Sequence, residues 1–300
     1  MGVGAVPVDV TNPGQVFACL GFVEAADILI GHAAGGFDWA GPEPVRFRLA
    51  SAGEEDPVAR VLRFLDEATV TSLAPPGSKN DTGKWDVDTI DVDTIDGGSS
   101  SRAFPFPDPE SPAKLPACLQ DSDGHVIVID HWGDATRRDN VKFWAGAGGY
   151  PGAALARDAL ELVRGRLVDE AGDPFAVDAL QSGSFRFDWR RDYVPLDAGF
   201  SPNVHGNVVM RGYPVVELLA AIGLTHARPV RHNKLSYSYG VAGVAGTDLY
   251  DPIFLRAALG ARQPPLPGML FRRFRMQLDW PGQENQARCI TSVIEERSQT

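Results

Sequence analysis

Acidic and histidine side chains gather at the end of one apolar stretch of the chain, and side chains of these types can bind a metal ion. The stretch HVIVID at 125–130 predicts a short buried strand that leads directly into His131. Metal-dependent nucleases surround a catalytic ion with protein ligands, so Asp130, His131 and Asp134 are the candidate residues of such an enzyme. The structural alternative is that His131 and Trp132 only pack at the end of the strand. We favour this alternative and expect no catalytic residue, no metal site and no cofactor.

Basic side chains form short groups along a chain that is acidic as a whole. The chain has 28 Lys and Arg residues against 39 Asp and Glu residues, a net charge of −11. One basic group, at 228–234, precedes Tyr237 and Tyr239, and it joins side chains that neutralise phosphates to rings that can stack on bases. A second group lies at 272–275 and a third at 190–191. Because free-standing nucleic-acid binders usually have a basic surface, the net charge predicts that any such contact is narrow.

Motifs of several enzyme classes are missing from the sequence. There is no GxSxG nucleophile elbow, and the glycine-rich turn at 146–152 matches neither the P-loop nor the GxGxxG pattern. Cys19, Cys118 and Cys289 are far apart and odd in number, which indicates a reducing, cytoplasmic setting rather than a disulfide framework. No run of 18 or more apolar residues occurs, so we expect no membrane partner.

The elements that must position these groups show both helical and strand patterns. Asn12 predicts the start of a helix that ends at Gly31, and Asp56 predicts the start of a second helix. Pro214 predicts the start of a further helix, which Gly223 ends. Strands are predicted at 45–49, 125–130, 184–189, 235–239, 269–280 and 286–294. The fold class is therefore α+β, with mixed or antiparallel strands and several amphipathic helices.

The middle of the chain differs in composition from both flanks. Residues 75–113 are rich in Pro, Gly, Ser and Asp, and the unit DVDTI occurs twice in succession at 86–95. The acidic spacing lacks the full ligand set and the glycine of an EF-hand loop, so we interpret the segment as an acidic insertion or linker. This division predicts an N-terminal α/β part at 1–74 and a main α+β part at 114–300, which can together form one domain.

Four phrases are spread in order over most of the chain. They are TNPGQ with FACLGF in 11–22, HW at 131–132 with KFWAG at 142–146, LDAGFSPN at 196–203, and YPVVELLAAIGL at 213–224 followed by Arg228 and Pro229. Together these phrases resemble the small large-subunit-like proteins of type I-U CRISPR systems, also called type I-G. The resemblance implies a non-catalytic component of the Cascade effector complex that acts in antiviral defence.

In such a complex, the large subunit engages the protospacer-adjacent motif, holds target DNA, contacts the guide RNA and helps to recruit the helicase-nuclease. The implied partners are therefore other Cascade subunits, guide RNA, target DNA and the helicase-nuclease, with sequence specificity supplied mainly by guide pairing. Arg, Asn and Lys have the geometry that suits contacts with base edges. The candidate nucleic-acid-binding residues are Arg137, Arg138, Lys142, Asn203, Arg228, Arg231, Asn233 and Lys234.

Two alternatives to a DNA- and RNA-binding subunit stay open. One is the metal-dependent nuclease built on Asp130, His131 and Asp134. The other is an acidic adaptor that contacts only proteins, which the net charge of −11 suits.

Overall fold

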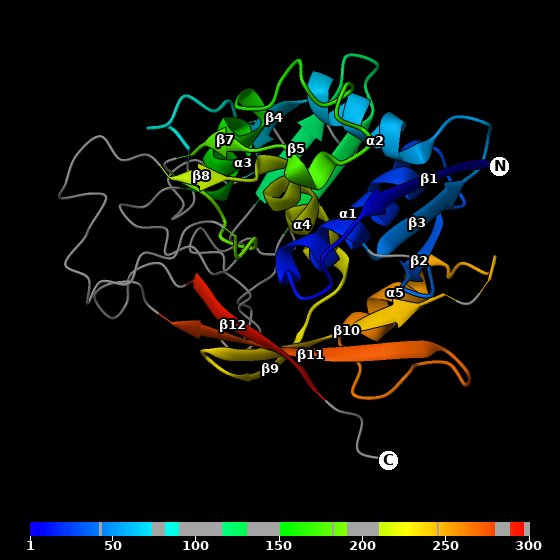
Figure 1. The fold of residues 1–300 in the computed structure, drawn as a ribbon. Helices are drawn as coiled ribbons and strands as arrows, with labels where there is room; N and C mark the ends of the chain where they lie inside the picture. The colour runs from blue at the N-terminus through cyan, green and yellow to red at the C-terminus, as the bar shows by residue number, and fades with distance from the viewer. Residues whose placement is uncertain are drawn as a thin grey trace, which may run out of the picture.

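Two sheets and the helices packed between them organise the fold (Figure 1). The computed structural model describes residues 1–41, 44–73, 82–89, 116–130, 151–181, 183–190, 210–244, 246–279 and 289–296. Within these residues, the larger sheet has the strand order β1 (Gly2–Pro7), β3 (Arg46–Ser51), β2 (Ala34–Asp38), β10 (Ser236–Gly243), β11 (Leu270–Asp279) and β12 (Cys289–Glu296). A further strand, β9 (Val230–Asn233), pairs with the first three residues of β10, Ser236–Ser238. All of these pairs are antiparallel except β2 with β10, which meet in parallel at one pair, Phe37 and Gly243.

The smaller sheet joins residues that lie on opposite sides of the 75–113 segment. It consists of β4 (Thr69–Ser72), β5 (Pro116–Gln120) and β6 (Val126–Asp130), all antiparallel. A two-stranded ribbon is formed by β7 (Ala179–Leu180) and β8 (Arg211–Gly212). One hydrophobic core extends from Val6 to Ile290, so the parts before and after the segment share both a sheet and a core.

Helices pack between the two sheets and against the larger sheet. They are α1 (Pro13–Leu29), α2 (Pro57–Glu67), α3 (Gly152–Glu161), α4 (Pro214–His226), α5 (Pro252–Leu259) and the short 3-10 helix η3 (Pro174–Ala176). The ring of Phe17 on α1 meets Tyr239 of the larger sheet edge-on, with 5.9 Å between ring centroids. α4 packs on the other side of α1 and contacts β6 of the smaller sheet. These mixed sheets and interposed helices confirm the α+β prediction.

Local signals set the first two helices where the sequence predicts them. The Asn12 side chain accepts a hydrogen bond from the Gly14 amide at 3.1 Å, and Asp56 accepts one from the Val58 amide at 2.8 Å. Each bond satisfies an amide that has no partner within the first turn of its helix. Gly31 follows α1 with a φ of +91°, a conformation that glycine adopts at little cost.

α1 and α4 approach each other at glycines, which corrects the predicted end of α4. A Cβ atom on Gly21 would lie 1.9 Å from the Leu219 carbonyl oxygen, and one on Gly223 would lie 2.3 Å from that of Phe17. Gly223 therefore allows close helix packing in the interior of α4, and the helix continues to His226. Glycine is a frequent helix terminator, but here its missing side chain is used for packing.

The predicted strand at 184–189 is also wrong. Its described residues form no ladder, although Phe185 and Phe187 are fully buried with their rings stacked at 5.7 Å. The amides of Phe187 and Asp188 instead donate to the buried Glu217 carboxylate, both at 3.1 Å. The Glu217 carboxylate thus accepts the hydrogen bonds that the carbonyl groups of a neighbouring strand would otherwise accept.

Candidate nucleic-acid interface

Two basic groups that are some 40 residues apart in the sequence lie on neighbouring strands of the larger sheet. The 228–234 group covers β9, and the 272–275 group lies in β11, with β10 between them (Figure 1). Register decides which side chains share a face, because residues directly opposite each other point to the same side of a sheet. Ser238 of β10 pairs with Arg275 of β11, and Gly240 pairs with Arg273.

The tyrosines of β10 point to the opposite side, into the core. Tyr237 is 1% exposed and Tyr239 is fully buried. The Tyr239 ring stacks on Phe274 at 5.4 Å, and its hydroxyl donates to the Val10 carbonyl at 2.9 Å. The prediction that these rings stack on bases is therefore wrong for this conformation, because strand alternation turns them away from the basic side chains.

The outer face of β9–β11 carries Arg273 and Arg275, and His232 and Arg262 lie close to them; we call these four side chains the basic face. The only carboxylate that ion-pairs with its arginines in the described chain is Glu296 of β12. Its Oε1 lies 2.7 Å from Nε of Arg275, and its Oε2 lies 3.1 Å from Nε of Arg273. One carboxylate thus balances two guanidinium groups, and the basic face retains positive charge.

Arg273 and Arg275 differ in their burial and in the geometry of their contact with Glu296. The Nε and Nη2 atoms of Arg273 are buried and have no hydrogen-bond partner among the described residues, so its contact with Glu296 is an ion pair without hydrogen-bond geometry. Arg275 is more open, with 44% of its side chain exposed. Arg272, the neighbour of Arg273, lies on the inner side and makes a bidentate pair with Glu295 at 2.8 and 2.7 Å.

His232 reaches over β10 from the other side. It lies at an irregularity in the β9–β10 ladder, and its Nε2 atom is 2.8 Å from the Ser238 hydroxyl. Partial burial lowers the pKa of the His232 ring most, and the charge of Arg275 lowers it further. Glu296 opposes this decrease, Arg273 and Arg262 add smaller decreases, and the net effect is a lower pKa. His232 is therefore neutral at pH 7 and surrounded by positive charge.

The predicted binding residues that the structure describes lie around the basic face rather than in it. Arg231 pairs with Tyr237 and so points to the inner side, where its Nε atom is buried without a hydrogen-bond partner among the described residues. Asn233 accepts a hydrogen bond from the Leu235 amide at 2.8 Å and shapes the β9–β10 turn, in which Lys234 is exposed. Arg228 is half-buried just before β9.

Four other predicted binding residues, Arg137, Arg138, Lys142 and Asn203, lie outside the described residues. Nucleic-acid binding by all eight stays a prediction. The sequence analysis placed His232, Arg273 and Arg275 in two basic groups but not among the eight candidate binding residues, and it did not single out Arg262. The available signal was the i, i+2 spacing of Arg273 and Arg275, which places both on one face of a strand.

Arg190, the described residue of the third basic group, makes its contacts within the protein. The guanidinium of Arg190 donates to the Asp188 carboxylate at 2.6 Å and to the Phe175 carbonyl at 2.7 Å. It also lies 3.5 Å from the centre of the Tyr213 ring. Asp188 in turn accepts from the Asn12 side chain at 2.9 Å, so Arg190 completes a network that holds the start of α1.

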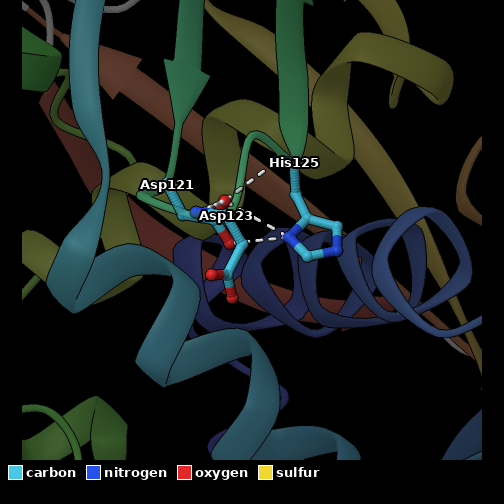
Figure 2. Close-up of side chains that lie close together, drawn as sticks. All are labelled: Asp121, Asp123 and His125. Atoms are coloured by element: carbon cyan, nitrogen blue, oxygen red, sulfur yellow. Dashed lines mark hydrogen bonds and ion pairs between the residues drawn. The ribbon is translucent and has the colours of Figure 1, made fainter.

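A cluster of Asp121, Asp123 and His125 closes the β5–β6 hairpin (Figure 2). Asp121 accepts hydrogen bonds from the amides of Asp123 at 3.1 Å and His125 at 2.8 Å, and its Oδ2 lies 2.9 Å from the His125 ring and 3.4 Å from Arg60. Burial raises the pKa of Asp121, but these hydrogen bonds and positive charges lower it more, for a net decrease. Because protein donors already occupy its oxygens, Asp121 stabilises the turn rather than offering a metal site.

Of the three residues in the nuclease hypothesis, the structure describes only the backbone of Asp130. Asp130 ends β6, where its backbone pairs with Pro116, and His131 and Asp134 lie outside the described residues.

Cys19, Cys118 and Cys289, which are all described, form no disulfide, and Cys19 and Cys118 are buried. Among the described helices, none has the length and apolar character needed to span a bilayer.

Comparisons of the chain with protein-family models, with characterised proteins and with solved structures found no match. The geometry of the basic face and the resemblance of the four sequence phrases therefore supply the arguments for a function.

Proposed function

We propose that this chain is a nucleic-acid-binding subunit of a type I-U or I-G CRISPR effector complex, in the role of the large subunit and without chemistry of its own. The observation that supports binding is the basic face, where Arg273 and Arg275 share one carboxylate and the side chain of Arg275 is 44% exposed. The four sequence phrases support the particular family. In this role the chain contacts target DNA and guide RNA beside other Cascade subunits, and it serves antiviral defence in the cytoplasm.

The acidity of the chain fits a subunit better than a free-standing binder. A net charge of −11 repels nucleic acid over the Debye length of about 8 Å at physiological salt, so a small basic face alone gives weak binding. Neighbouring subunits can add the missing cationic surface. The chain then needs to supply only a local contact near the protospacer-adjacent motif, while guide pairing reads most of the sequence.

The test is co-expression of the tagged chain with its neighbouring genes and a guide array. Binding of the purified complex to a target duplex is then measured with the chain present, with it omitted, and with Arg275→Gln. The matched control is Arg63→Gln, because Arg63 is 47% exposed, pairs with Glu55 at 2.7 Å, and lies on α2, away from β9–β12 (Figure 1).

We expect omission to abolish motif-dependent binding, Arg275→Gln to weaken it, and Arg63→Gln to leave it unchanged. A complex that binds equally well without the chain refutes the proposal. Magnesium-dependent cleavage that is lost in Asp130→Ala would support the nuclease instead. Assembly that is insensitive to salt and gives no crosslinks to nucleic acid would support the protein-only adaptor.

A further inference from the structure

Arg275 has most of its hydrogen-bonding capacity unused. A guanidinium offers five N–H donors, and the described contacts of Arg275 use only Nε, which donates to Glu296 at 2.7 Å. The two terminal nitrogens carry the other four donors on a side chain that is 44% exposed. Such a planar pair of nitrogens binds two oxygens of a phosphate or a carboxylate at once.

His232 and Arg275 converge over the same residue of β10. Ser238 is directly opposite Arg275 in the ladder, and its hydroxyl contacts Nε2 of His232 at 2.8 Å. Ser238 itself is fully buried. The exposed parts of His232 and Arg275 therefore flank one point on the sheet surface.

The charges that face His232 come from several elements. Arg275 and Arg273 lie on β11, Arg262 follows α5, and Glu296 lies on β12. Partial burial, together with three cations against one anion, disfavours a proton on His232 in the unliganded protein. A bound anion reverses this balance, because its negative charge stabilises the imidazolium ion.

We infer that this point on the basic face binds a single phosphodiester group of a nucleic acid through Arg275, and that His232 takes up a proton as the phosphate binds. The inference rests on the proposed function and names the contact within it. Arg273 and Arg262 contribute charge from the side, and Ser238 positions the His232 ring. A phosphodiester and a carboxylate each present two charged oxygens to such a pair, so the choice of a phosphate rests on the proposed function.

Proton uptake fixes the sign of the pH dependence. An unperturbed histidine titrates near pH 6.5, and the pKa of His232 in the unliganded chain is lower. The bound phosphate raises it, so binding strengthens as the pH falls from the bound to the unbound pKa. A phosphodiester stays ionised throughout this range, so any change in its affinity reports on the protein.

The experiment uses the full chain and a 12-residue single-stranded oligothymidylate. Binding is measured by fluorescence anisotropy between pH 5.5 and pH 8 at several salt concentrations. The titration of His232 is followed by NMR with and without the oligonucleotide, and His232→Asn assigns its signal among the six histidines. Arg63→Gln is the control for a general loss of positive charge, and circular dichroism verifies that each variant is folded.

We expect the oligonucleotide to move the His232 titration to higher pH and to bind more tightly at low pH. Arg275→Gln should weaken binding about tenfold and reduce the salt slope by about 0.7, the value for one phosphate contact on a single strand. His232→Asn should remove the pH dependence while retaining binding at pH 8.

A His232 titration that the oligonucleotide does not move overturns the inference. So does an acidic peptide, polyglutamate, that binds at this face when the oligonucleotide does not. These outcomes leave the proposed function standing if the effector complex still requires the chain to bind its target. Conversely, a complex that does not require the chain refutes the proposed function even when the oligonucleotide test succeeds.

Discussion

Replacement of Gly21 by alanine tests a close backbone contact in the core, the crossing of α1 and α4. In an open helix this change stabilises the protein by about 1 kcal/mol, because alanine is the better helix former. In this structure the added Cβ lies 1.9 Å from the Leu219 carbonyl oxygen, which belongs to the backbone and cannot rotate away. Ordinary contact needs about 1.5 Å more, so the two helices must separate.

The cost of that separation exceeds the gain in helix propensity. Overpacking a well-packed core typically costs about 1–3 kcal/mol, and more when the backbone must move along a whole interface. We expect Gly21→Ala to lower the free energy of unfolding by about 2–4 kcal/mol net, and to lower Tm by about 4–12 °C. Thermal unfolding followed by circular dichroism and urea titration measure both quantities.

The matched control is Gly172→Ala. A Cβ atom there meets nothing within 4 Å, and the backbone is not in the left-handed region, so stability should stay the same or rise slightly. Gly223→Ala is expected to destabilise as well, since its Cβ lies 2.3 Å from the Phe17 carbonyl oxygen. The double variant should cost less than the sum, because one separation accommodates both methyl groups. If Gly21→Ala unfolds at or above the wild-type temperature, the close crossing of α1 and α4 is refuted.

Three further predictions concern polar contacts in and around the core. Arg256→Ala should lower Tm by about 3–6 °C. The guanidinium of Arg256 donates to the buried Glu24 carboxylate at 2.6 and 2.5 Å, and the variant leaves that carboxylate without this donor. An unchanged melting curve would contradict this prediction. Tyr239→Phe should cost about 1 kcal/mol in urea unfolding, since the Val10 carbonyl loses its buried donor, and a neutral result would refute the role of this bond. The lowered pKa of Asp121 means that its stabilising contribution is present above its unfolded pKa of about 3.9 and is lost as the pH falls through the folded value. Stability should therefore fall more steeply from pH 5 to pH 3 in the wild type than in Asp121→Asn, and parallel curves would rule this out.

Much of the secondary structure follows from short-range signals in the sequence. The caps at Asn12 and Asp56 act on amides two residues away, so no distant part of the chain is needed to recognise them. The alternation of Phe47 and Leu49 with Arg46 and Arg48 likewise marks β3, because a strand exposes every second residue. The α+β class follows from such local patterns.

Tertiary structure alone decides what these elements do with their side chains. Composition cannot show that Tyr239 faces the core or that Gly223 lies inside a helix, because both depend on α1 packing against them. The basic face likewise exists only in the folded chain. His232 and Arg275 are distant in the chain and become neighbours only through the registers of β9 with β10 and of β10 with β11. A shift of one residue in either ladder would turn one of them to the other side of the sheet.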